Sequence, residues 1–137
     1  MIQIYFDENF SNRTAEGFSL LTYQGYKNDV SCDSTRNRFG EGALDETIIP
    51  NLAHEKAVLI TLDTKIHKDR QQVELCRNSG IQIVFLQQKG NKYWGIIKMI
   101  VNNWDNLIQY KSQNNEAFGL EFKNKSVRVL WGREWTS

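Results

Sequence analysis

The sequence has few of the residues that build cross-linked, zinc-bound or membrane-spanning proteins. Its two cysteines, Cys32 and Cys76, are isolated and form no CxxC pair, so they predict neither a disulfide framework nor a cysteine-based zinc site. The two histidines are not spaced from each other or from the cysteines as zinc ligands are. No run approaches roughly 18 apolar residues, and the N-terminus lacks a basic-then-apolar signal pattern. We therefore expect a cytoplasmic protein without a membrane segment.

The chain also lacks an excess of charge of either sign, with 17 basic and 16 acidic side chains. A nearly neutral balance argues against a coat protein held on nucleic acid by bulk positive charge, although it is compatible with a local basic patch. The hydrophobic content of 40% and the charged content of 24% are those of an ordinary globular protein. The length predicts one domain over residues 1–137.

Short apolar segments alternate with helical patterns from residue 2 to about residue 110. The expected strands are 2–6, 27–32, 57–62 and 81–86. The expected helices run from residue 9 or 11 to about 24 and over 44–57, 69–80 and 93–110. Residues 33–42 are polar and contain glycine, which favours a loop, and two runs around "KNK" predict a β-hairpin over about 116–131. The alternation indicates an α/β fold with a mainly parallel sheet covered on both sides.

Three residues of the helical segments need separate interpretation. Pro50, the only proline, fits a helix interior poorly, so it either occupies the first turn of a shorter helix or kinks a longer one. Trp94 and Trp104 are at helical spacing, which favours burial in the core over a role as base-stacking platforms.

Acidic residues follow two of the expected buried strands. Asp7 and Glu8 come after the first strand, and Asp63 comes after the strand at 57–62. The carboxyl ends of parallel strands meet at one edge of a sheet, and functional groups collect there. Asp45 and Glu46 open the helical segment after a loop, from which a carboxylate could reach the same edge.

Carboxylates that converge in this way repel one another unless a cation lies between them. A set of oxygen ligands suits Mg²⁺ or Mn²⁺ better than Zn²⁺. Each acid taken singly is equally compatible with a turn or a helix cap, because aspartate favours both positions. The sequence therefore leaves two interpretations open, a metal site and a set of structural acids.

Together with these acids, three segments resemble the PIN-like domain family, of the type found in VapC-type toxins and their relatives. The segments are "FDEN" at the first strand end, "ALDETIIPNLAHEKAVLITLDTKI" in the middle, and "SGIQIVFLQ" before a helix that carries tryptophan. The resemblance implies a three-layer α/β sandwich with a mainly parallel sheet. It also implies a hydrolase, since many members are Mg²⁺- or Mn²⁺-dependent ribonucleases.

The family's metal-binding acids carry over to Asp7, to Asp45 or Glu46, and to Asp63. The resemblance implies Asp7, Glu46 and Asp63 as the catalytic group, with Glu46 either as a ligand or as a residue that holds water. Many relatives carry a further aspartate where this chain has Lys65, so the choice between one metal and two stays open.

Basic residues flank the expected metal edge. Lys65, Lys68 and Arg70 follow Asp63, while Arg36 and Arg38 lie in the expected loop before the middle acids. These cations could neutralise RNA phosphates near the acidic centre, or they could belong to a solvated loop and a helix start.

The resulting expectation is a metal-dependent endoribonuclease that is the toxin of a toxin–antitoxin pair, with RNA as substrate and an antitoxin protein and a second copy of the chain as partners. The alternative is a catalytically weakened PIN-like module that binds RNA or a protein, which Lys65 motivates. A receiver-like phosphoacceptor fits less well, because only Lys89 stands loosely where such domains need a lysine.

Overall fold

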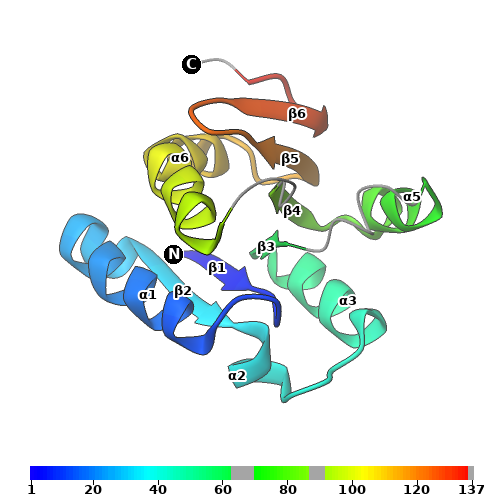
Figure 1. The fold of residues 1–137 in the computed structure, drawn as a ribbon. Coiled ribbons are helices and arrows are strands. Elements are labelled where there is room, and N and C mark those ends of the chain that lie inside the picture. Colours follow the sequence, from blue (N-terminus) through cyan, green and yellow to red (C-terminus); the bar gives the residue numbers. More distant parts are fainter. Residues whose placement is uncertain (63–69, 87–91, 136–137) are drawn as a thin grey trace.

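A computed structural model describes residues 1–62, 70–86 and 92–135 and shows a six-stranded sheet between two layers of helices (Figure 1). The strands are β1 (Ile2–Phe6), β2 (Val30–Ser34), β3 (Val58–Thr61), β4 (Gln82–Leu86), β5 (Phe118–Phe122) and β6 (Val127–Trp131). Their order is β2-β1-β3-β4-β5-β6, with every pair parallel except the antiparallel β5–β6 pair. The expected α/β sheet and C-terminal antiparallel pair are therefore confirmed.

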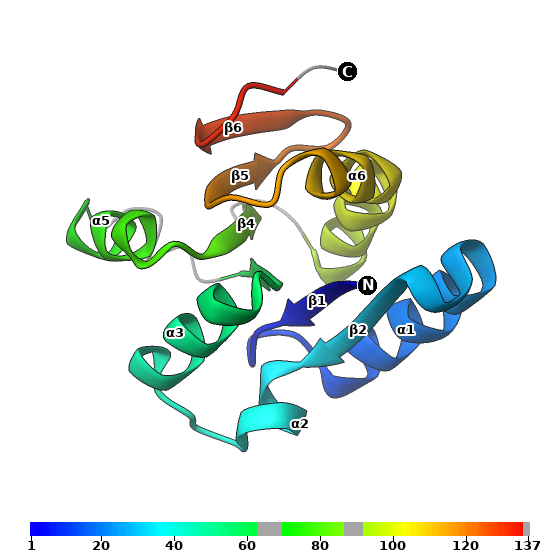
Figure 2. The same cartoon turned by 180° about the vertical axis from the view of Figure 1, so that it is seen from behind.

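The helices cover both faces of the sheet. They are α1 (Asn12–Tyr26), α2 (Thr35–Phe39), α3 (Asp45–Glu55), α5 (Arg70–Ser79) and α6 (Tyr93–Gln113), with a 3₁₀ turn η1 (Lys27–Asp29) after α1. Figures 1 and 2 show α1 and α6 on one side of the sheet and α3 and α5 on the other. No helix in these described ranges is long and apolar enough to cross a membrane.

Alternating side chains of the strands divide the core into two parts. Ile4 and Phe6 of β1 belong to the cluster under α1 and α6, whereas Tyr5 belongs to the cluster under α3 and α5. This is the period of two that a strand buried on both faces requires. On the first face the ring of Phe6 stacks on Phe18 of α1 at 5.3 Å, and Phe18 stacks on Trp104 of α6 at 4.9 Å.

The structure corrects the loop that was expected over 33–42 and decides between the two positions considered for Pro50. The loop expected over 33–42 is wrong in part, because β2 continues to Ser34 and α2 follows it. The Ser34 hydroxyl accepts a hydrogen bond from the Asn37 N–H at 2.9 Å, a capping contact that makes a polar segment helical. Pro50 lies inside α3, so the longer helix is the one that forms.

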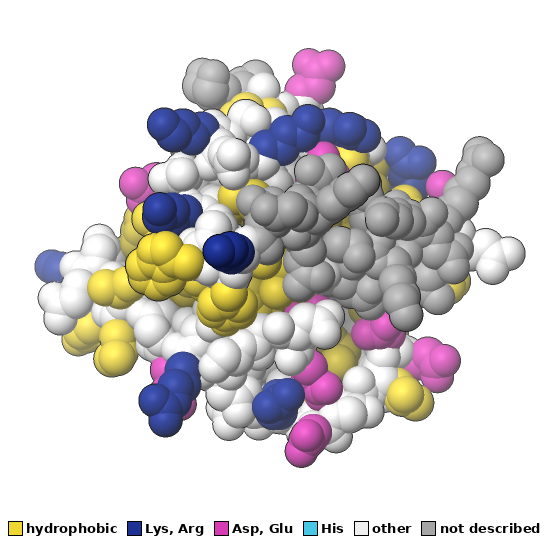
Figure 3. Space-filling model, in the orientation of Figure 1, with side chains coloured by type: hydrophobic (Ala, Val, Ile, Leu, Met, Phe, Trp, Pro, Cys, Tyr) yellow, Lys and Arg dark blue, Asp and Glu magenta, His cyan; other side chains and the backbone are white. Residues whose placement is uncertain are grey.

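The burial expected for Trp94 is also wrong, because its side chain is 69% exposed while Trp104 is buried. The buried stripe of α6 passes through Ile96, and Trp94 is two residues earlier, about 200° around the helix. Both α1 and α6 leave further apolar side chains exposed, among them Leu20 and Leu21. Apolar side chains are visible alongside α1 and α6 in the space-filling view of Figure 3.

Candidate functional site

Asp7 extends the end of β1 by one residue. Its backbone N–H donates to the Ile60 carbonyl at 3.1 Å, which places Asp7 beside Thr61 at the carboxyl edge of the sheet. Tyr5 packs on the α3–α5 side, and side chains two residues apart along a strand share a face. The Asp7 carboxylate therefore lies at the edge, on the side of the sheet that α3 covers.

Two donors hold the Asp7 carboxylate in one orientation. The Asn9 N–H donates to Oδ1 at 3.1 Å, and the buried Thr61 hydroxyl donates to Oδ2. The Asn9 contact is the local turn that an aspartate commonly forms two residues on. The Thr61 contact joins β1 to β3, and no local turn requires it. Oδ1 of Asp7 thus stabilises the turn after β1, while its Oδ2 is oriented separately, at the edge of the sheet, by Thr61.

A cavity of about 190 Å³ opens at this edge and is lined by acids from two separate elements. Asp7 comes from the end of β1, and Asp45 is the first residue of α3, where the helix dipole favours a negative charge. Glu46, the next residue, is exposed and is not among the residues that line the cavity. The structure thus brings together Asp7 and Asp45 of the acids expected from the sequence.

Thr35 lines the same cavity and was not expected from the sequence. It is the first residue of α2 and is 1% exposed, yet its hydroxyl oxygen has no hydrogen-bond partner among the described residues. Buried polar atoms almost always have a partner, and an ion or a water commonly supplies it where the protein does not. The Thr35 hydroxyl is therefore a buried polar atom beside the cavity for which the described residues supply no partner.

Glu8 also lines the cavity, but one of its carboxylate oxygens is held by the chain itself. The Gly42 N–H donates to Glu8 Oε1 at 2.6 Å. Gly42 has a φ of +75°, which a glycine adopts without strain. This contact fixes the segment that leads into α3, so Glu8 helps to position Asp45.

Several residues expected at the site lie outside the described part of the chain. Asp63, Lys65 and Lys68 belong to 63–69, and the side chain of Arg70 is also not described. Asp63 comes two residues after Thr61 in the sequence. Across the described ranges, no group of three or more His, Cys, Asp or Glu side chains could hold a metal ion.

Arg38 is engaged away from the cavity. Its guanidinium forms an ion pair with Glu55 of α3, donates to the Tyr5 hydroxyl at 2.9 Å, and lies 4.8 Å from the ring centroid of Phe39. The hydrogen bond from Arg38 lowers the pKa of the Glu55 carboxyl. Arg36 lines a different depression, between α1 and β2. The structure therefore brings neither arginine to the acidic cavity, and their RNA contacts stay a prediction.

A buried acid that sequence reasoning missed lies in the same row of the sheet as Thr61. Glu121 of β5 is 1% exposed and pairs with Phe85, which in turn pairs with Thr61. The Arg128 guanidinium is 3.9 Å from its carboxylate. In the sequence Glu121 stands in a short hairpin strand, where a charged residue is normally taken to face solvent, so no signal distinguished it.

Comparison with known proteins gives one match. A family model described as a PIN like domain matches residues 2–88, which is more than half of the chain and includes Asp7, Asp45 and Asp63. No curated protein and no solved structure matches. On the family match, the order of its elements and the position of its acids, the chain belongs to the PIN-like domain family.

Proposed function

We propose that this chain is a metal-dependent ribonuclease that hydrolyses RNA phosphodiester bonds with Mg²⁺ or Mn²⁺. The family match assigns it a nuclease-type fold. The observation that carries the proposal is the convergence of Asp7 and Asp45, from two different elements, on one cavity at the carboxyl edge of the parallel strands. In open α/β sheets this edge is where ligands bind.

The residues around the cavity fit a hard divalent cation. Asp7, Glu8 and Asp45 bring carboxylates to its lining, and no lysine, arginine, histidine or cysteine is among its described lining residues. In the proposal Asp7 and Asp45 hold the cation, together with Asp63 from the segment after β3. When bound, the cation supplies Lewis-acid polarisation of the phosphate and acidifies a water molecule.

The protein's own contribution is to orient these ligands before substrate arrives. Thr61 and the Asn9 N–H fix the two oxygens of Asp7, and Glu8 fixes the segment before Asp45. Outer-shell contacts of this kind commonly change metal affinity or activity by about 10- to 100-fold. Thr61 is therefore proposed as a positioning residue for Asp7.

Asp45 takes the role of ligand in this proposal, in preference to Glu46. Both side chains are exposed, but Asp45 lines the cavity and Glu46, at the next position of α3, is not among its lining residues. Glu46 keeps its alternative role as a residue that holds water at the site. The two acids are adjacent, so neutralising each in turn is a matched comparison.

RNA and a protein partner complete the proposal. Lys65, Lys68 and Arg70 are the proposed phosphate contacts, because they follow Asp63 directly in the sequence. The toxin role rests on the likeness to VapC-type toxins, and a small antitoxin encoded beside this chain would support it. Exposed apolar side chains on α1 and α6, including Leu20 and Leu21, support a protein contact with an antitoxin or a second copy of the chain.

The deciding experiment is cleavage of a fluorescent single-stranded RNA by the wild type, Asp7→Asn, Asp45→Asn and Glu46→Gln. We expect Mn²⁺-dependent cleavage that EDTA abolishes, a loss of about 100-fold or more in Asp7→Asn and Asp45→Asn, and a smaller loss in Glu46→Gln, which keeps the metal ligands. Circular dichroism checks that each variant is folded. Cleavage that persists in EDTA, or in pure Asp7→Asn, would refute the proposal.

The second candidate function is a PIN-like module that binds RNA or a protein without cleaving it. Lys65 favours it, because many relatives carry an acid there. A wild type that binds RNA in the presence of Mn²⁺ but leaves it intact would establish this function in place of the first.

A further inference from the structure

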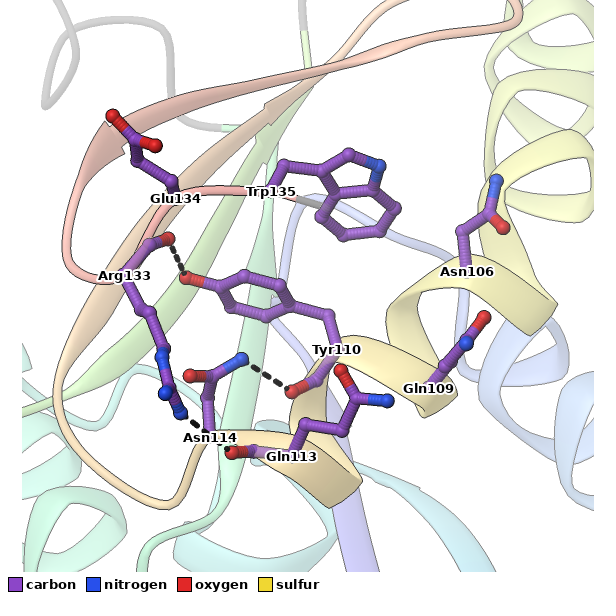
Figure 4. Close-up of a pocket in the computed structure, with 8 residues that line it drawn as sticks. All are labelled: Asn106, Gln109, Tyr110, Gln113, Asn114, Arg133, Glu134 and Trp135. Atoms are coloured by element: carbon purple, nitrogen blue, oxygen red, sulfur yellow. Dashed lines mark hydrogen bonds between the residues drawn. The ribbon is translucent and has the colours of Figure 1, made fainter. Parts of the chain in front are cut away.

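A second cavity, of about 610 Å³, lies between α6 and the residues that follow β6 (Figure 4). It shares no lining residue with the acidic cavity. At the start of α6 the Tyr93 hydroxyl accepts a hydrogen bond from the Ser11 N–H at 3.3 Å, near the Asp7 turn. The cavity begins at Asn106, about 20 Å further along the helix, and lies beyond residues 2–88 that the family model matches. It is therefore a separate feature of this chain.

The cavity has a flat aromatic wall. The rings of Tyr110 and Trp135 are stacked with centroids 5.1 Å apart and planes 17° from parallel. Tyr110 is buried, and its hydroxyl donates to the Arg133 carbonyl at 2.5 Å, which ties the segment after β6 to α6 (Figure 4). Trp135 is half-buried and lines the cavity. A supported indole of this kind is a surface on which a planar ring can stack.

Carboxamide side chains line the cavity beside this wall. Asn106, Gln109 and Gln113 are exposed and follow one another on α6 at spacings of three and four, so they form one stripe. Each carboxamide offers one acceptor oxygen and two N–H donors. Asparagine and glutamine pair in this way with adenine, which presents a donor at N6 beside an acceptor at N7.

The charges around the cavity are balanced. Arg133 and Glu134 are its charged lining residues, and Figure 4 shows the Glu134 carboxylate directed away from the carboxamides. The Arg133 guanidinium lies 3.5 Å from the backbone oxygen of Gln113. Because the site has one cation and one anion, it should recognise the ring of a nucleotide ligand more than the phosphates of that ligand. Binding should therefore depend only weakly on salt concentration.

We propose that this cavity binds an unpaired adenine base, stacked on Trp135 and hydrogen-bonded by the carboxamides of α6. The base can come from a free adenine nucleotide or from single-stranded RNA, since both present the same ring. The site does not depend on the acidic cavity, so it holds whether or not the chain is a nuclease.

The test is a titration of the full chain with adenosine, AMP, uridine and a short oligoadenylate. Binding is measured by tryptophan fluorescence and by calorimetry. Adenosine and AMP should bind, and uridine should bind at least about tenfold more weakly because it lacks the N6/N7 pair. Trp135→Leu and Gln109→Ala should each weaken adenosine binding by about tenfold or more. The exposed Gln109 provides a variant that leaves the stacked rings intact.

Trp94→Leu is the matched control, because it removes an exposed tryptophan at the other end of α6. It should bind adenosine like the wild type, as should Asp7→Asn. Oligoadenylate that binds much more tightly than AMP identifies RNA as the source of the base, and equal affinities identify a free nucleotide. No adenosine binding at millimolar concentration, or equal binding by Trp135→Leu and Gln109→Ala, would overturn the proposal.

Discussion

Replacing Lys111 by methionine should remove a pH dependence from the stability of the fold. Lys111 of α6 is 7% exposed, and its ammonium donates to the Lys56 carbonyl at 2.7 Å and to Asn115 Oδ1 at 2.9 Å. Both acceptors are neutral, so they do not balance the charge. Burial, with a smaller effect from the Lys56 charge, lowers the pKa of Lys111 from 10.5 to about 8.

The direction of the effect follows from proton binding in the two states. The unfolded chain keeps the Lys111 proton up to about pH 10.5, whereas the folded chain releases it from about pH 8. Between these values the unfolded state binds more protons, so the free energy of unfolding rises with pH. One proton contributes at most about 1.4 kcal/mol per pH unit. With these pKa values the gain is about 2 kcal/mol between pH 8 and pH 10.

The assay is urea unfolding of the wild type and Lys111→Met at several values between pH 7.5 and pH 10. Other titrating groups are common to both proteins, so they cancel when the two free energies of unfolding are subtracted. Lys98→Met, which removes an exposed lysine of the same helix, should track the wild type. A difference between wild type and Lys111→Met that stays constant with pH would refute the reasoning.

Three shorter predictions test other contacts. Thr61→Val removes the hydroxyl that holds Asp7 and should weaken Mn²⁺ binding by about tenfold or more, so an unchanged calorimetric affinity would show that Thr61 does not position the ligand. Replacing Lys68 and Arg70 with glutamine should reduce the salt slope of single-stranded RNA binding by about 1.4, and an identical slope would remove them from the RNA path. Burial raises the pKa of Cys32 to about 12, so its thiol should resist alkylation at pH 8 until the protein is unfolded, and rapid labelling of the native protein would contradict this.

Strands buried on both faces were the most predictable part of the fold. The segments that became β1, β3 and β4 are short and mostly apolar, so their type was clear without knowledge of their neighbours. Sheet order does not follow from such runs, and β1 lies between β2 and β3 because of tertiary packing. The short helix α2 was missed because a capping serine and a polar composition also describe a loop. The burial of Trp94 was predicted wrongly because the side of α6 that is buried is determined by the sheet that the helix covers.

Two of the acids that line the cavity were singled out from the sequence, Asp7 and Asp45, whereas the residues that contact them were not. Asp7 was indicated by its position after a buried strand. Asp45 could have been separated from Glu46, because Asp45 shares helical spacing with the buried Ile48 and Leu52. Thr61 gives no signal of this kind, since threonine in a strand is explained by its β propensity.

The most direct test of the account is the melting temperature of the wild type and Asp7→Asn with and without Mg²⁺ or Mn²⁺. A cation that binds only the folded protein stabilises it by about 2.7 kcal/mol at a hundredfold excess over its dissociation constant. We expect a clear upward shift for the wild type and for Glu46→Gln. Asp7→Asn, which has one charge less, should melt at or above the wild-type temperature without metal and should lose most of the shift. No shift in the wild type at millimolar Mg²⁺ or Mn²⁺ would contradict the metal site.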